Sequence, residues 1–248
     1  GIIHGAGDEL YNNASEFYRA ENGQPIGYFW GYKTAGIFQN TQEIDEWRAA
    51  GNGILQSNVQ PGDVRFVDRN HDGQINDKDK VNLGNGTPDF TLGLNLGFVY
   101  KGFDFSIVAN GAFGQQIVQS YRNHTRPTPN YTTAILDRWH GEGTSNRIPR
   151  VTDSNINYQF SDLFIQNGDY LRLSTLTLGY DFAKLFKGKA VSQARLYFQV
   201  QNLFIITGYD GMDPEIGFGS SNNSWVSGLD YGYYPRPRTV LVGVNLKF

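Results

Sequence analysis

One segment of the sequence carries oxygen-bearing side chains at the spacing of a cation-binding loop. Residues 68–79 read D-R-N-H-D-G-Q-I-N-D-K-D, with a glycine at the sixth position that allows a sharp turn. Hard cations such as Ca²⁺ take oxygen ligands at this spacing. The pattern predicts a structural Ca²⁺ that orders the loop rather than serving catalysis. Its ligands would be Asp68, Asn70, Asp72, the carbonyl oxygen of Gln74, and Asp79, with Asn76 acting through water.

Two features separate this loop from an EF-hand. Asp79 at the twelfth position is shorter than the usual glutamate, which weakens its reach toward a cation. Residues 64–67 read V-R-F-V, which is typical of a strand, so no helix precedes the loop. An Asx-rich turn that needs no metal remains the alternative interpretation.

The sequence indicates no group of catalytic residues. Cysteine is absent, and the four histidines stand at positions 4, 71, 124 and 140 without the spacing of metal ligands. The sequence has no G-x-S-x-G, no H-E-x-x-H and no phosphate-binding loop. A hydrolase is therefore disfavoured, and we expect a protein that is not an enzyme.

Composition limits the fold and the partners. The 248 residues include 30 glycines and 15% aromatic residues, which favours β-structure with many turns. A net charge of −3 argues against a chain that binds nucleic acid or anionic lipid over its whole length. No apolar run approaches the roughly 18 residues of a spanning helix, whereas the strands of a membrane barrel need apolar residues only at alternate positions.

Six segments have the alternation or length of strands. They are residues 27–38, 90–100, 103–113, 170–182, 194–206 and 239–248. In most of them one face is apolar and the other is polar or glycine, which suits a barrel in lipid better than a sandwich with a dry core. The two halves of segment 170–182 are out of phase, which predicts a bulge near Ser174.

The connections alternate between short and long. Lys101-Gly102 forms a tight hairpin and residues 183–193 a second short link, whereas residues 39–89, 114–169 and 207–237 form long loops. Outer-membrane barrels have this asymmetry, with short periplasmic turns and long outer loops. We expect the six segments to be adjacent strands, with the 68–79 loop on the outer side. Residues 41–50 predict a loop helix with Thr41 as its N-cap.

Several motifs together resemble one family over nearly the whole chain. They include G-I-F-Q at 36–39, Q-P-G-D-V-R-F-V-D at 60–68, L-G-N-G-T-P at 83–88, R-W at 138–139, I-P-R at 148–150, Y-L-R-L at 170–173, Q-N-L-F at 201–204, D-P-E at 213–215 and Y-P-R-P-R at 234–238. The combination resembles the C-terminal part of SusC/RagA-type TonB-dependent outer-membrane transporters of the Bacteroidetes.

The resemblance implies an all-β, antiparallel transmembrane barrel of about 22 strands with a plugged lumen. Residues 1–248 would be its C-terminal portion, with the plug domain and N-terminal strands outside this chain. The implied function is import of an oligosaccharide or peptide through the outer membrane of a Gram-negative bacterium. A SusD-like lipoprotein would deliver the nutrient, and the TonB complex would act through the missing N-terminal part. The alternative is a secreted calcium-binding β-module with a carbohydrate-binding role.

The last segment carries one further candidate residue. Apolar side chains occupy every even position from Val240 to Phe248. In a barrel these side chains would face membrane lipid, and Phe248 would lie at the periplasmic interface. An aromatic residue at the end of an alternating strand resembles the signal read by the outer-membrane assembly machinery.

Overall fold

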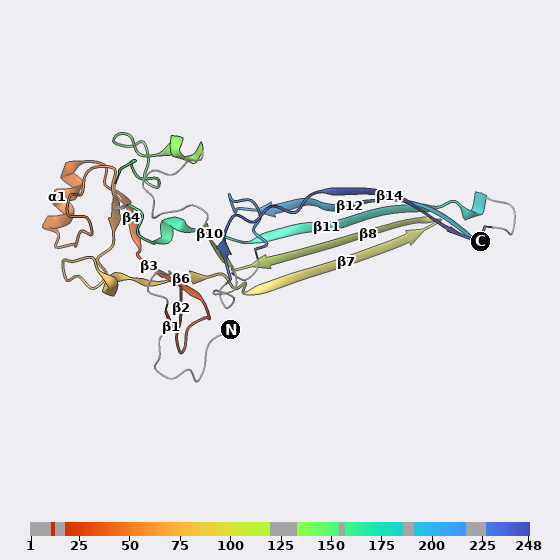
Figure 1. The fold of residues 1–248 in the computed structure, drawn as a ribbon, viewed down its shortest axis with the longest axis horizontal. Helices are drawn as coiled ribbons and strands as arrows, with labels where there is room; N and C mark the ends of the chain where they lie inside the picture. The colour runs from red at the N-terminus through yellow and green to blue at the C-terminus, as the bar shows by residue number, and fades with distance from the viewer. Residues whose placement is uncertain (1–10, 13–17, 120–132, 154–156, 186–190, 217–226) are drawn as a thin grey trace. The chain divides into compact units, whose positions relative to one another are not determined.

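The computed structural model describes all residues except 1–10, 13–17, 120–132, 154–156, 186–190 and 217–226 (Figure 1). The described chain is mainly antiparallel β-structure with few helices. None of its helices is long and apolar enough to cross a membrane. It divides into two compact units: Gly1–Gly86 with Val118–Gln166 and Phe218–Tyr231, and Thr87–Ile117 with Asn167–Gly217 and Gly232–Phe248. We call them the loop unit and the wall unit.

The wall unit is a five-stranded antiparallel sheet of long strands that run side by side (Figure 1). In spatial order its strands are β14 (Thr239–Lys247), β12 (Gln193–Thr207), β11 (Tyr170–Asp181), β8 (Phe103–Phe113) and β7 (Phe90–Tyr100). Five of the six expected segments are therefore confirmed as adjacent antiparallel strands. The short helix η4 (Ala183–Leu185) follows β11.

Two local predictions in this sheet are also confirmed. Lys101 and Gly102 both have positive φ angles, 49° and 93°, which is the backbone of a type I′ hairpin. The pairing of β11 shifts register between Leu173 and Thr175, so the bulge lies at Ser174. The bulge lets Leu173 and Leu176 both contribute to the apolar face despite their odd spacing.

The remaining segment, residues 27–38, does not join this sheet. It divides into β3 (Tyr28–Gly31) and β4 (Thr34–Ile37), which belong to two separate small sheets of the loop unit. Tyr28 and Phe29 are neighbours along the strand, yet both are fully buried. A segment buried on both sides cannot lie on a two-faced wall, and this is why the expectation of six adjacent strands is wrong.

The loop unit contains short strands around small apolar clusters. One sheet has the order β1 (Tyr11–Asn12), β2 (Tyr18–Ala20), β3 and β6 (Val81–Asn85), whereas β4 pairs with β5 (Val64–Phe66). Its short helices are η1 (Asp77–Asp79), η2 (Thr133–Asp137) and η3 (Asp162–Phe164), the last followed by β10 (Ile165–Asn167). Residues of β9 (Gln116–Gln119) pair in parallel with β13 (Leu229–Asp230). The two clusters centre on Phe29 with Val118, and on Tyr32 with Phe66.

The helix α1 (Thr41–Ala49) lies where the sequence predicts one, but its cap differs. Asn40, not Thr41, is the N-cap, because the Asn40 side chain accepts a hydrogen bond from the Glu43 backbone N–H at 2.9 Å. The Glu43 carboxylate in turn accepts from the Gln39 backbone N–H at 2.9 Å. Asparagine and threonine both favour the cap position, so composition alone did not separate the two neighbours.

Candidate functional site

The five-stranded sheet has one apolar face and one polar face. Alternate residues of its edge strands β7 and β14 form exposed apolar rows, each residue 41% to 71% exposed: Leu92, Leu94, Leu96 and Phe98, and Val240, Val242, Val244 and Leu246. Successive side chains of a strand point to opposite faces, so each row lies on one side of the sheet. So large an apolar surface is typical of a protein or membrane contact.

Aromatic rings lie at both ends of this apolar face. At one end the Phe103 and Tyr180 ring centroids are 4.4 Å apart, and the Tyr180 and Phe182 centroids 4.6 Å apart. At the other end Phe90 stacks on Phe113 with 4.8 Å between the centroids. Between these ends the row on β7 is aliphatic at Leu92, Leu94 and Leu96. Aromatic girdles at both edges of an aliphatic band are the pattern of strands that cross a membrane.

The length of the band fits a bilayer. Ten residue steps separate Phe90 from Tyr100 on β7, which is about 34 Å at about 3.4 Å per residue. A strand tilted by about 45° then rises about 24 Å, close to the apolar height of about 25 Å in outer-membrane barrels.

The polar face carries a charge pair that crosses an intervening strand. Arg195 on β12 donates from Nε to Asp104 Oδ1 of β8 at 2.7 Å and from Nη2 to Oδ2 at 2.5 Å. Strand β11 lies between these two strands, and Gly179 is its residue in register with Asp104. A Cβ at position 179 would overlap both charged side chains. Glycine is therefore required for the pair to span three strands, and we call this pair the strap.

A second charged cluster lies at the opposite end of β11. The buried Arg172 contacts Asp213 through Nη2 at 2.6 Å and Glu215 through Nε at 2.9 Å. Glu215 also pairs with Arg236 at 3.0 Å. The motifs D-P-E and P-R-P-R thus meet the Y-L-R-L strand at one charge network. Two carboxylates neutralise the buried guanidinium, and the network fixes two loop segments against the strand.

The predicted cation loop is folded by hydrogen bonds between its own side chains and backbone. Asp68 Oδ2 accepts from the backbone N–H groups of Gly73, at 2.8 Å, and Gly53, at 3.0 Å. Asp72 accepts from the Gln74 N–H and from the Asn70 side chain. These are the bonds of consecutive Asx turns.

Asp79 has a local structural role at the end of this loop. Its two carboxylate oxygens accept from the backbone N–H groups of Arg69 and Asn76, both within 2.9 Å. The exposed neighbour Asp77 bonds Lys80 at 2.7 Å, and this contact lowers the pKa of the Asp77 carboxyl. Among the described residues no three acidic or histidine side chains are grouped to hold a metal ion. Ca²⁺ binding therefore stays a prediction.

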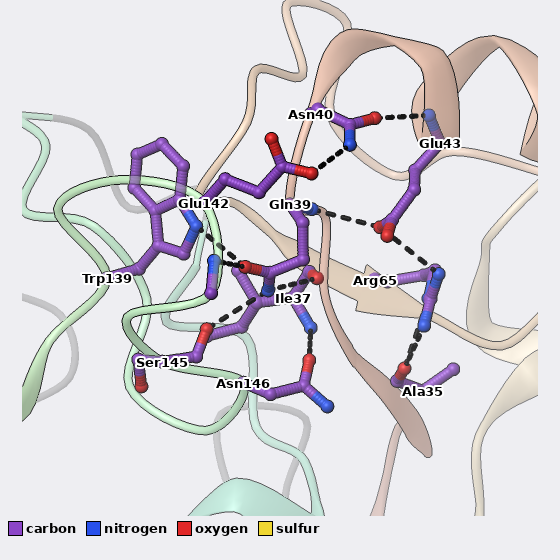
Figure 2. A network of polar contacts seen from close by, with 11 residues as sticks. Ala35, Ile37, Gln39, Asn40, Glu43, Arg65, Trp139, Glu142, Ser145 and Asn146 are labelled. Atoms are coloured by element: carbon purple, nitrogen blue, oxygen red, sulfur yellow. Dashed lines mark hydrogen bonds and ion pairs between the residues drawn. The ribbon is translucent and has the colours of Figure 1, made fainter.

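A polar network joins two segments of the loop unit that lie about 100 residues apart in sequence (Figure 2). The Gln39 side chain accepts from Trp139 Nε1 at 3.1 Å and from the Gly143 N–H at 2.9 Å, and it donates to the Ser145 carbonyl at 3.0 Å. The network borders a pocket of about 220 Å³ lined by Ile37, Gln39, Glu43, Arg65, Gly143, Ser145 and Asn146. The network joins the G-I-F-Q and R-W motifs, a contact that the local sequence pattern does not predict.

Buried charge also holds the loop unit together. Asp63 is fully buried and accepts from Arg150 Nε at 2.6 Å and from Asn157 Nδ2 at 2.9 Å. Burial also raises the pKa of the Tyr32 hydroxyl to about 12. The bond between Asp63 and Arg150 connects the Q-P-G-D-V and I-P-R motifs, so these motifs mark a structural contact between distant loops.

Solved structures of the same fold are known. The chain aligns with the RagAB peptide transporter with a TM-score of 0.68 and 20% identity, covering 96% of this chain and 25% of that one. The RagAB peptide importer in its open-open state gives a TM-score of 0.69 at 21% identity, covering 100% of this chain and 25% of that one. At this identity the likeness shows the fold alone.

Sequence comparison identifies relatives. No family model matches the sequence. TonB-dependent receptor P3 of Formosa agariphila is 33% identical over 237 residues, which are 91% of this chain and 22% of that protein. TonB-dependent receptor SusC of Bacteroides thetaiotaomicron is 32% identical over 197 residues, which are 79% of this chain and 18% of that protein. The chain thus spans about a fifth of the length of these two relatives. It belongs to the SusC/RagA family of TonB-dependent receptors.

Proposed function

We propose that this chain forms part of the barrel wall of a TonB-dependent importer in the outer membrane of a Gram-negative bacterium. The observation that carries the proposal is the exposed apolar face of the wall unit, bounded by aromatic rings and about as tall as a bilayer's apolar layer. The polar face would line the lumen. A secreted β-module would leave the apolar face in water, so the importer is favoured over that alternative.

The proposed cargo is an oligosaccharide or a peptide, delivered by a SusD-like lipoprotein. TonB would supply energy through the plug domain, which with the N-terminal strands would lie in the remainder of the transporter. The long connections 114–169 and 207–237 are the proposed lipoprotein contacts, because both are far longer than ordinary loops. Parts of both connections lie outside the described residues.

The test uses the full transporter in its native membrane. We expect it to fractionate with the outer membrane, to migrate faster on gels before heating than after, and to co-purify with a lipoprotein. A deletion strain should lose growth on the cargo while retaining growth on monomeric nutrients. A protein that is soluble without detergent would overturn the proposal.

We also propose that the 68–79 loop binds Ca²⁺. The supporting observation is that Asp68 is buried while its Oδ1 atom has no hydrogen-bond partner. Asp68 and the Gln74 carbonyl would hold the ion with Asn70, Asp72 and Asp79. Calorimetric titration of the full transporter with CaCl₂ should give heat that Asp68→Asn removes and that Asp45→Asn, on α1, retains. Absence of binding heat in the parent protein would refute the site.

A further inference from the structure

Two arginines precede β14, and they differ in their partners. Arg236 forms an ion pair with Glu215 at 3.0 Å. Arg238 is exposed, and its side chain has no hydrogen-bonding or ion-pair partner among the described residues. The segment that carries it is fixed, because Asn202 Nδ2 donates to the Pro237 carbonyl at 3.0 Å. Arg238 therefore has hydrogen-bond donors that no described residue of this chain uses.

Arg238 continues the apolar row of β14. It stands two residues before Val240, in phase with the even-numbered residues that end at Phe248. Ten residue steps separate Arg238 from Phe248, as ten separate Phe90 from Tyr100 on β7. If Phe248 and Tyr100 mark the same edge of the apolar band, Arg238 and Phe90 mark the other.

The register of the sheet supports this alignment. Successive cross-strand partners lead in one row from Tyr100 to Phe103, Tyr180, Leu196 and Val244. Phe248 lies four residues beyond Val244. In a barrel whose strands tilt by about 35–45° and lie about 4.8 Å apart, residues at one membrane depth shift along the chain from each strand to the next. Over four neighbouring strands this shift is about 4 to 6 residues. Phe248 therefore lies at the depth of Tyr100, and Arg238 at the depth of Phe90.

An unpaired guanidinium at the edge of an apolar band has a defined chemistry. Its planar donors match the oxygens of a phosphate, and its aliphatic stem packs on apolar groups. Tyr234, at 88% exposed, precedes it, as expected for an aromatic side chain at a membrane interface. We propose that Arg238 binds a phosphate of a phosphorylated glycolipid in the outer leaflet. This rests on the proposed membrane location of the wall unit.

The test measures lipid binding by the full transporter in detergent. Bisphosphorylated lipid A is titrated in and bound copies are counted by native mass spectrometry. Arg238→Gln should weaken binding about fivefold, and Arg238→Lys should restore part of it. Lys247→Gln, an exposed cation at the opposite end of β14, is the matched control and should bind as the parent does. Dephosphorylated lipid A should not distinguish the parent from Arg238→Gln.

Equal binding of bisphosphorylated lipid A by the parent and Arg238→Gln would overturn the inference. So would loss of lipoprotein co-purification in Arg238→Gln with unchanged lipid binding, because Arg238 would then contact the lipoprotein. Failure of the proposed function is visible separately. It would show as a parent protein that needs no detergent and has no heat-dependent gel mobility, before any variant is compared.

Discussion

Asp63 is the residue whose loss should most weaken the loop unit. It has no exposed surface, and it is bonded by Arg150 and Asn157. Removing one partner of a buried ion pair costs about 3–5 kcal/mol, because the other charge is left without compensation. We expect Asp63→Ala to lower the free energy of opening of this unit by about 3 kcal/mol, measured by hydrogen exchange.

A matched control for that experiment lies on the surface of α1. Asp45 and Arg48 form an exposed pair with 4.0 Å between the charged atoms. Exposed pairs of this kind contribute a few tenths of a kcal/mol, so Asp45→Ala should leave the exchange pattern nearly unchanged. Equal effects of the two substitutions would show that burial of Asp63 does not increase its contribution to the stability of the loop unit.

Tyr32 gives the loop unit a pH limit. Burial, with the nearby carboxylates of Asp77 and Asp79, raises the pKa of Tyr32 from 10.0 to about 12. A folded-state pKa above the unfolded value favours the neutral phenol, so its stabilisation is complete below pH 10 and is lost as the pH rises toward 12. Exchange protection of β4 and β5 should fall over that range, and less so in Tyr32→Phe. Tyrosinate absorbance that shows Tyr32 ionising near pH 10 would contradict this expectation.

Among the elements, the long strands were predictable and the short ones were not. Period-two alternation located β7, β8 and β14 to within a residue or two, because one face of each is apolar and the other polar. β3 lacks that contrast because Tyr28 and Phe29 are buried on opposite faces, and β4 has only four residues, of which Ile37 alone is buried. Their sheet partners could not be inferred from local pattern.

The candidate site divides in the same way. The apolar face and the even-numbered row that ends at Phe248 follow from alternation alone. The strap and the Gln39 network depend on contacts between segments 91 to 106 residues apart. In the sequence Gly179 is one of several glycines in the expected strands, and only cross-strand register shows that Asp104 and Arg195 meet above it.

The strap makes a prediction about β11. In Gly179→Ala the new methyl group would overlap Asp104 and Arg195, so the pair must part or the strand must shift. Overpacking of this kind costs about 1–3 kcal/mol. We expect the full transporter to unfold at lower temperature, read from its gel mobility after graded heating. Gly93→Ala is the control, because a Cβ there has open space. Equal melting of both variants would mean that the strap does not constrain β11.

At the scale of the whole molecule, the topology places long connections and short links at opposite ends of the wall sheet. Every long connection leaves or enters the wall sheet at the end where β7, β11 and β14 begin, and the short links join the other end. Loop segments can therefore vary without altering the strand register that keeps the apolar face continuous. The edge strands β7 and β14 keep unpaired backbone groups, which the remainder of the barrel would satisfy.

Phe248 is the residue at which the proposed assembly of the barrel in the outer membrane can be tested. It is 84% exposed and ends the even-numbered apolar row of β14. An aromatic side chain at the band edge would both anchor the strand at the interface and present the feature that assembly machinery recognises. We expect Phe248→Ala to lower the amount of folded transporter in the outer membrane severalfold, measured by heat-dependent gel mobility of membrane fractions. Molecules that do assemble should bind cargo with unchanged affinity. Phe248→Tyr keeps the aromatic ring and should assemble as the parent does. Parent-level assembly of Phe248→Ala would limit this residue to a place in the aromatic girdle.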